Sequence, residues 1–241
     1  MISYSKNIDT PAQDSIPKLN KGHSVVYTLE SKDIRFIQLI FNHPLLRRLK
    51  IAVLNDEWYK QIPKENPNYI CRTMLARSSG ENSLPLHIDS FIPSSGKYTW
   101  VLQIAVALED FNFDNGCTLV VPGSHLEDRY AKQEDLSDAI PLELKAGDIV
   151  AWDSRLWHGA NPNNSKKTRW SIIGTFTRWW VKQNYNMKMN MPNDIYQNLS
   201  DEEKSILGFC CMPPDSEYDR IDIKGGYNIL PKSLKNQKGN K

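Results

Sequence analysis

The segment between residues 69 and 180 most constrains the fold, because it holds six short runs rich in valine, isoleucine, threonine and aromatic residues. Turn sequences around Gly96, Gly116, Gly123 and Gly147 separate several of these runs. Short strands at this spacing favour a sandwich or barrel over alternating βαβ units. We therefore predict a mainly β fold with strands at residues 69–77, 98–108, 117–121, 140–144, 149–153 and 169–180.

A helical pattern precedes this β-rich segment. Apolar residues recur at three- and four-residue spacing over residues 31–49, which predicts an amphipathic helix with a break at Pro44. Residues 51–54 fit either a strand or the end of that helix.

A second helix is expected near the C-terminus. Ser200 and Glu203 have the spacing of a capping box, and Leu199 is placed to act as its hydrophobic staple. This helix is expected to end at Gly208.

The simplest domain organisation is a single domain over residues 1–241, with its β core at residues 69–180. Residues 1–22 are polar and contain prolines, so we expect an extended lead-in. Residues 232–241 carry four lysines and are expected to form a mobile tail.

Composition and charge disfavour several classes of protein. A net charge of +2 over 241 residues is too small to indicate a nucleic-acid partner or a membrane surface. No run approaches the roughly 18 apolar residues of a membrane span, and the start lacks the apolar core of a signal peptide. The four cysteines show no zinc-type spacing, and Cys210 and Cys211 are adjacent, a poor geometry for a disulfide. We expect a reduced, cytoplasmic protein, and its oligomeric state is not readable from the sequence.

Three side chains of the β-rich segment are candidate metal ligands. His87 and Asp89 are two residues apart, so on a strand or its end their side chains point to the same face. His158 follows an apolar strand and precedes Gly159, which permits close backbone approach. Two histidines and one carboxylate leave three positions open on an octahedral metal, an arrangement that suits non-haem iron(II).

Arg169 follows His158 by eleven residues, across a proline- and asparagine-rich turn. A hairpin return of this length can bring its guanidinium beside the metal, where it can hold a carboxylate with two parallel hydrogen bonds. Ser171 points to the same face and adds a hydroxyl donor. A single arginine beside a strand is more often a surface charge, so Arg169 gains meaning only together with the other motifs.

The order of these motifs resembles the phytanoyl-CoA dioxygenase family. The resemblance rests on His87 with Asp89, the stretch from Asn115 to His125, the turn at Gly147, the sequence around His158, and Arg169. It extends from about residue 70 to about residue 210 and includes the capping box. It implies a double-stranded β-helix (cupin or jelly-roll) core with flanking helices.

The resemblance also implies a reaction and a set of site residues. Iron(II) would be bound by His87, Asp89 and His158. The cosubstrate 2-oxoglutarate would chelate that iron and be consumed with O2 to give succinate and CO2. The residues expected to bind it are Arg169 through the far carboxylate, Ser171 beside it, Thr118 facing the cosubstrate, and Gln103 as a weaker candidate.

The motifs indicate the roles of His125 and of the substrate-binding residues less specifically. His125 is expected to support the turn that it ends, and a contact with cosubstrate or substrate is the alternative. Candidate substrate contacts are Arg155, Trp157, Arg178 and Trp179, where Trp179 and Trp180 form either an aromatic wall or a buried pair. The polar loops favour a small polar metabolite or natural-product intermediate as the substrate.

The type of oxidation is only partly determined by these motifs. The presence of Asp89 favours hydroxylation, desaturation or ring closure, because related halogenases have a small residue there. Two other classes of protein use the same fold. A non-oxidative metal-dependent enzyme would have no reason to place an arginine behind the metal. A non-catalytic binding protein would keep the fold and lose the metal ligands, and this chain keeps all three.

Overall fold

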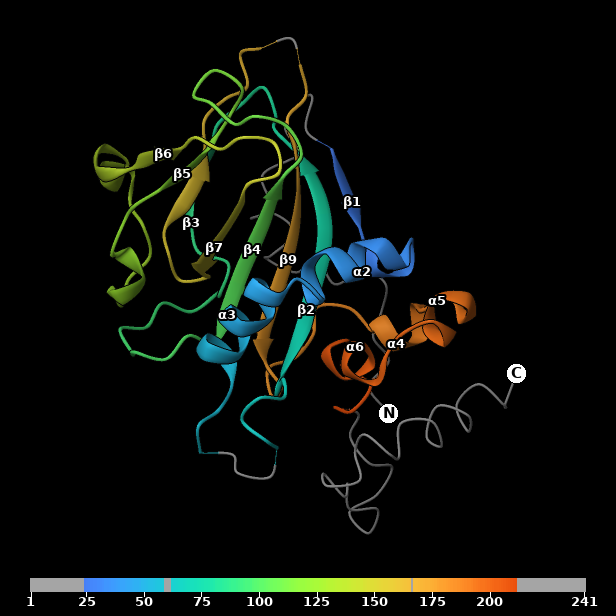
Figure 1. Ribbon diagram of the computed structural model, residues 1–241. Helices are drawn as coiled ribbons and strands as arrows, with labels where there is room; N and C mark the ends of the chain where they lie inside the picture. The colour runs from blue at the N-terminus through green and yellow to red at the C-terminus, as the bar shows by residue number, and fades with distance from the viewer. Residues whose placement is uncertain (1–23, 59–61, 166, 212–241) are drawn as a thin grey trace, which may run out of the picture.

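The computed structural model describes residues 24–58, 62–165 and 167–211, which form two antiparallel sheets with helices packed on one of them (Figure 1). The expected lead-in at residues 1–22 and tail at residues 232–241 lie outside the described residues. One sheet has the strand order β1-β2-β9-β4-β7 and the other β3-β8-β5-β6. The strands are β1 (Val25–Tyr27), β2 (Tyr69–Ser78), β3 (Leu84–His87), β4 (Val101–Ala107), β5 (Thr118–Val120), β6 (Ile140–Leu142), β7 (Ile149–Asp153), β8 (His158–Ala160) and β9 (Trp170–Arg178).

The five-stranded sheet has one apolar and one largely polar face near its centre. On the first face, Ile104 of β4 and Phe176 of β9 belong to the main hydrophobic core, which also includes side chains of the helices. On the second face, Gln103 of β4 lies opposite Thr175 of β9, which in turn lies opposite Thr73 of β2. Opposing residues of antiparallel strands share a face. The Thr73–Thr175–Gln103 row therefore points towards the four-stranded sheet and away from the helices.

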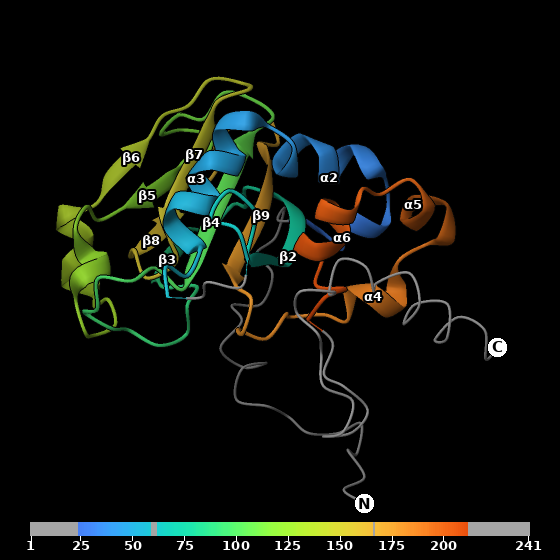
Figure 2. The ribbon, with the colours of Figure 1, turned by 60° about the horizontal axis from the view of Figure 1, so that its bottom comes forward.

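Helices cover the apolar face of the five-stranded sheet. Figure 2 shows the four-stranded sheet and the C-terminal helices at opposite sides of the molecule. Pro44 stands in the first turn of α3, where its missing N–H costs nothing, so the expected break falls between α2 and α3. The helical segments are η1 (Leu29–Ser31), α2 (Ile34–Phe41), α3 (Pro44–Leu54), η2 (Ser124–Leu126), η3 (Gln133–Asp138), α4 (Met187–Asn190), α5 (Asn193–Gln197) and α6 (Asp201–Ile206).

A buried lysine joins the two N-terminal helices to the sheet. The side chain of Lys50 in α3 is fully buried, and its Nζ donates to the carbonyl of Ile40 at 2.7 Å. The same Nζ lies 4.3 Å from the centroid of the Phe176 ring. Burial lowers the pKa of Lys50 to about 7. The Ile40 carbonyl, near the end of α2, thus obtains a donor inside the core, which links α2, α3 and β9.

The capping box at the C-terminal helix is confirmed. Ser200 Oγ accepts a hydrogen bond from the Glu203 amide at 3.2 Å, and the Ser200 amide donates to Glu203 Oε2 at 2.7 Å. Leu199 is buried in the main core, as a hydrophobic staple requires. The helix ends at Ile206, two residues earlier than expected, and Gly208 follows with a φ of 85°.

All six strands expected from the sequence occur, as β2, β4, β5, β6, β7 and β9. Residues 51–54, which the pattern left undecided, belong to α3. The strands β1, β3 and β8 were not expected as separate elements. Each is three or four residues long and lies outside the six runs rich in valine, isoleucine, threonine and aromatic residues, so only pairing with a neighbouring strand defines it.

All four cysteines are free thiols, and Cys71 and Cys117 are buried. No helix within the described ranges has both the length and the apolar content needed to cross a membrane.

Candidate metal centre

Short strands of the smaller sheet place the two histidines opposite each other. His87 ends β3 and His158 begins β8, and the two residues are direct partners in the antiparallel ladder. Asp89 follows two residues after His87, and its amide donates to the Ser154 carbonyl at 2.9 Å. A Cβ at Gly159 would collide with the backbone carbonyl of Leu84 in β3. The expected close approach beside His158 is therefore confirmed, and it allows β3 and β8 to pair.

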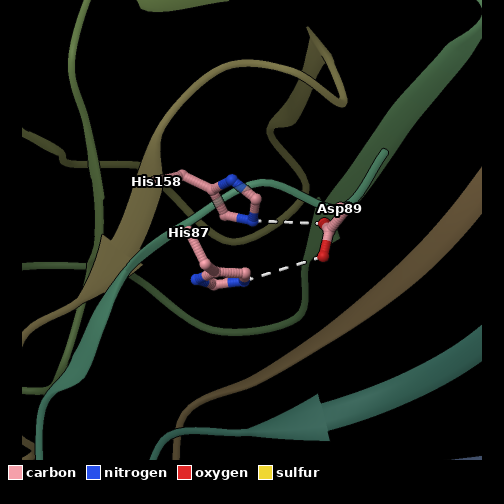
Figure 3. A group of neighbouring side chains, drawn as sticks. All are labelled: His87, Asp89 and His158. Atoms are coloured by element: carbon pink, nitrogen blue, oxygen red, sulfur yellow. Dashed lines mark ion pairs between the residues drawn. The ribbon is translucent and has the colours of Figure 1, made fainter. Parts of the chain in front are cut away.

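The three side chains converge on one point (Figure 3). One ligand atom from each of His87, Asp89 and His158 lies within 4.8 Å of the others, so the group can hold a metal ion. His158 Nε2 lies 3.2 Å from one Asp89 carboxylate oxygen, and His87 Nε2 lies 3.6 Å from the other. The sequence prediction that these residues share a face is confirmed by this geometry.

Backbone carbonyls orient both imidazole rings. His87 Nδ1 lies 2.9 Å from the Pro85 carbonyl, and His158 Nδ1 lies 2.9 Å from the Leu156 carbonyl. A carbonyl oxygen only accepts, so each Nδ1 carries a proton. A protonated His158 donates from Nε2 to Asp89, whereas the neutral ring offers the Nε2 lone pair to a metal. Metal-binding histidines are commonly held in this way by their second ring nitrogen. Both rings are therefore prepared to bind a metal through Nε2.

The Asp89 carboxylate is held by a short relay from the five-stranded sheet. Gln103 Nε2 donates to Asp89 Oδ2 at 2.5 Å, and Thr175 Oγ1 donates to Gln103 Oε1 at 2.5 Å. Burial opposes ionisation of this carboxyl, but the charge and hydrogen bond of His158 outweigh it and hold the pKa of Asp89 well below its usual range. Gln103, expected beside a cosubstrate, thus has its side-chain amide on the metal-binding carboxylate.

Arg169 lies just before β9 and is 6% exposed. Its Nη2 donates to the carbonyl of Gly116, and its guanidinium carbon lies 4.1 Å from the centroid of the Phe111 ring. Its Nε is fully buried and has no hydrogen-bond partner. Burial lowers the pKa of Arg169 to about 10, so the group stays charged at neutral pH. A buried cation with an unused N–H is suited to an anionic ligand.

Two neighbours of Arg169 complete this end of the site. Ser171 is 4% exposed, and its Oγ donates to the Arg77 carbonyl at 3.4 Å. Arg77 of β2 lies directly opposite Ser171, and its positive charge acts on both histidines and on Arg169. Sequence reasoning gave Arg77 no role at the metal, although a charged side chain directly after the apolar residues 74–76 was a usable signal.

Thr118 lies on the same face as His158. It is opposite Ala160 of β8, while Val120 is opposite His158, and residues two apart on a strand point to one side. Thr118 is half-buried. Its expected contact with a cosubstrate stays a prediction.

Two of the four candidate substrate contacts, Arg155 and Trp157, contact other residues of the chain. Arg155 pairs with Asp153 at 2.9 Å, and its remaining donors reach the backbone carbonyls of Ser94 and Gly96. Trp157 is 3% exposed and packs in a small apolar cluster with Ile88 and Val121. Their contacts serve the loop and the core, so they give no support to a role in substrate binding.

The other two candidate substrate contacts are Arg178 and Trp179. Alternation along β9 places Arg178 on the face opposite to Ser171 and Thr175, and its Nε donates to the Thr99 carbonyl at 3.0 Å. Trp179 and Trp180 are 37% and 51% exposed, so the buried-pair alternative is wrong.

His125 lies in η2, within the turn that it was expected to support. The hydrogen bonds that hold this turn come from Ser124, whose Oγ donates to the Val121 carbonyl at 2.7 Å and accepts from the Trp157 amide at 2.8 Å. The His125 ring makes no hydrogen bond within the described part of the chain, so its role stays a prediction.

Two facing antiparallel sheets with two imidazoles, a carboxylate and a buried arginine between them define a metal-binding protein of the double-stranded β-helix class. The family model described as phytanoyl-CoA dioxygenase (PhyH) matches residues 4–171, more than half of the chain, and the chain belongs to this family.

Several of the named relatives are dioxygenases. Dioxygenase olcK of Penicillium canescens is 26% identical over 198 residues, which cover 76% of this chain and 59% of that protein. Phytanoyl-CoA dioxygenase 1 of rice (Oryza sativa subsp. japonica) is 33% identical over 112 residues, 39% of this chain and 40% of that protein. The chain spans 41% to 59% of the length of the first curated relatives that it matches.

The fold is shared with solved structures. HygX from Streptomyces hygroscopicus, solved with nickel and 2-oxoglutarate bound, superposes with a TM-score of 0.54 at 15% identity. The alignment covers 71% of this chain and 76% of HygX. At this identity the likeness concerns the fold alone.

Proposed function

We propose that the protein is an iron(II)- and 2-oxoglutarate-dependent dioxygenase. His87, Asp89 and His158 are the residues that would hold the iron. The observation that carries the proposal is the combination of this triad with Arg169, whose buried Nε has no partner. A hydrolase or isomerase on the same fold needs the metal ligands but has no use for that arginine.

Arg169 and Ser171 would bind the far carboxylate of 2-oxoglutarate. Along β9, Ser171 lies four residues from Thr175, the residue that supports Gln103 and hence Asp89. Four residues of a strand span roughly 13 Å. A short dicarboxylate that chelates the metal at one end and meets a long arginine side chain at the other fits this separation. The guanidinium offsets the cost of burying that carboxylate.

Bound iron would supply the activation of O2, coupled to conversion of 2-oxoglutarate into succinate and CO2. The protein's own contribution is to keep the ligands on one side and to hold the cosubstrate by its far end. We propose hydroxylation of a small metabolite or natural-product intermediate, with desaturation or ring closure as variants of the same oxidation. The dioxygenase names of the fungal relatives support an oxidation.

The test is an anaerobic titration of the purified chain with Fe(II) and 2-oxoglutarate. A weak visible charge-transfer band is expected only when both are present, because it arises from the cosubstrate bound to the metal. Admission of O2 should then give succinate. A non-oxidative metal enzyme would bind Fe(II) without producing succinate, and a binding protein of the same fold would show neither result.

Gln103 provides a more specific prediction for the metal centre. Gln103→Leu is expected to weaken Fe(II) binding by about 10- to 100-fold, the usual cost of losing a group that orients a metal ligand. Thr175→Val should have a smaller effect in the same direction, since Gln103 would keep its bond to Asp89. Isothermal titration with Fe(II) under argon measures both. Unchanged affinity in Gln103→Leu would show that Asp89 needs no support from the larger sheet.

A further inference from the structure

Arg72 occupies an irregular position in β2. In the pairing with β9, Cys71 lies opposite Phe176 and Thr73 lies opposite Thr175, so Arg72 between them has no partner. An unpaired residue of this kind is a β-bulge, which redirects a side chain and often lies next to a functional site. The bulge thus places a charged residue between Cys71, which belongs to the hydrophobic core, and Thr73 of the Thr73–Thr175–Gln103 row.

The Arg72 side chain is buried without a polar partner. The residue is 9% exposed, and its Nε is fully buried and makes no hydrogen bond. Within the described residues, no hydrogen bond or ion pair involves its guanidinium, which instead lies 5.0 Å from the centroid of the Phe91 ring. Leaving a buried donor without an acceptor costs about 1–3 kcal/mol. Such a group is expected where a ligand supplies the missing acceptor.

Arg72 lies close to the candidate metal centre. Its positive charge interacts with the carboxylate of Asp89, and Phe91 follows Asp89 by only two residues. The backbone of Phe91 is held in the left-handed region, with a φ of 67°, and its carbonyl accepts a hydrogen bond from the Tyr130 hydroxyl at 2.6 Å. A non-glycine residue in this region is strained. The loop therefore keeps the Phe91 ring against the guanidinium at a cost in backbone energy.

Arg72 and Arg169 are separated along the strand direction. Arg169 lies near the Ser78 end of β2, because Ser78 is opposite Trp170. Arg72 lies at the other side of the Thr73–Thr175–Gln103 row, which supports Asp89. A cosubstrate that reaches from the metal to Arg169 extends away from Arg72. The unpaired N–H of Arg72 is thus left for a second ligand.

We propose that Arg72 binds a carboxylate of the molecule that is oxidised, which makes the substrate an organic acid. This inference rests on the proposed function. The charges of iron(II), Asp89, Arg169 and doubly ionised 2-oxoglutarate cancel. Arg77 and Arg72 add further positive charge near these groups, which favours an anionic substrate. Phe91 and Ile92, each 65% exposed, offer apolar surface beside it. The substrate therefore combines an apolar portion with the carboxylate.

The test uses the full chain with Zn(II) in place of iron and a saturating concentration of 2-oxoglutarate. Arginine labelled with ¹⁵N makes the Nε–H groups of Arg72 and Arg169 visible by NMR, and variants assign them. The probe is benzoate, compared with benzamide, which has the same ring but no charge. Benzoate should shift the Arg72 signal in a saturable way, and benzamide should leave it in place.

Two variants make the test specific. Arg72→Gln should weaken benzoate binding by at least about tenfold, the effect of losing one charge-assisted hydrogen bond. Arg48→Gln removes an exposed arginine of α3 and should bind benzoate normally. The response of the Arg169 signal to 2-oxoglutarate, retained in Arg72→Gln, shows that this variant is folded.

The outcomes separate the two proposals. If 2-oxoglutarate shifts the Arg169 signal but benzoate never moves that of Arg72, the carboxylate site is refuted and the proposed function stands. If 2-oxoglutarate alone shifts the Arg72 signal, the two arginines have been assigned to the wrong ligands and the inference fails. If neither Zn(II) nor 2-oxoglutarate binds, the proposed function itself fails.

Discussion

Asp89→Ala is expected to lower Fe(II) affinity by more than about 100-fold and to abolish succinate formation at micromolar iron. The estimate exceeds the 10- to 100-fold cost of losing a group that only orients a ligand, because Asp89 would bind the metal directly. The substitution also leaves two imidazoles with no carboxylate between them and the Gln103 amide without its acceptor. Anaerobic titration and a succinate assay measure the two effects.

The matched control is Asp138→Ala, which removes an exposed carboxylate at the end of η3. It should bind iron and form succinate like the unaltered protein. Full succinate formation by Asp89→Ala at the same iron concentration would remove Asp89 from the metal centre.

Arg169→Ala is expected to raise the apparent KM for 2-oxoglutarate by about 30- to 1000-fold while Fe(II) binding stays unchanged. Truncating one partner of a buried, hydrogen-bonded charge pair costs about 2 to 4 kcal/mol, which corresponds to this range. The KM of Arg169→Lys for 2-oxoglutarate should lie between those of the unaltered protein and Arg169→Ala, because lysine keeps the charge but not the planar pair of donors. Succinate formation at increasing concentrations of 2-oxoglutarate gives the KM of each variant.

Arg48→Ala, on the exposed side of α3, is the control for loss of a positive charge. A KM for 2-oxoglutarate that did not change in Arg169→Ala would indicate another cation at the far carboxylate. Arg77, opposite Ser171, is the nearest candidate on the adjacent strand.

Features with a short local signature were predictable. The capping box at Ser200 and Glu203 depends only on two residues three positions apart at the start of a helix, and it occurs as expected. The turns at Gly116, Gly123 and Gly147 all require positive φ, which glycine adopts without strain. Residues 51–54 remained undecided because four apolar residues suit a strand and a helix equally.

The candidate site was predictable to the extent that its residues lie on the same or adjacent short motifs. His87 and Asp89 share a face by their spacing alone. His158 and Arg169 entered through the order of the motifs, and the structure brings His158 to the other two ligands. No motif fixed the roles of Arg155 and Arg178. In the structure their N–H groups donate to Asp153 and to backbone carbonyls.

The sequence by itself determined the chemical nature of the site: two imidazoles, a carboxylate and an arginine, each beside a turn or strand end. The tertiary structure alone decided that Gln103 supports Asp89, that Arg77 lies opposite Ser171, and that Arg72 forms a bulge in the pairing of β2 with β9. The physical reason for this difference is that the spacing of His87 and Asp89 and the conformation of a turn depend on residues that are close in the sequence. Cross-strand register depends on how two sheets and their helices pack together, and a shift of one residue would reverse every face.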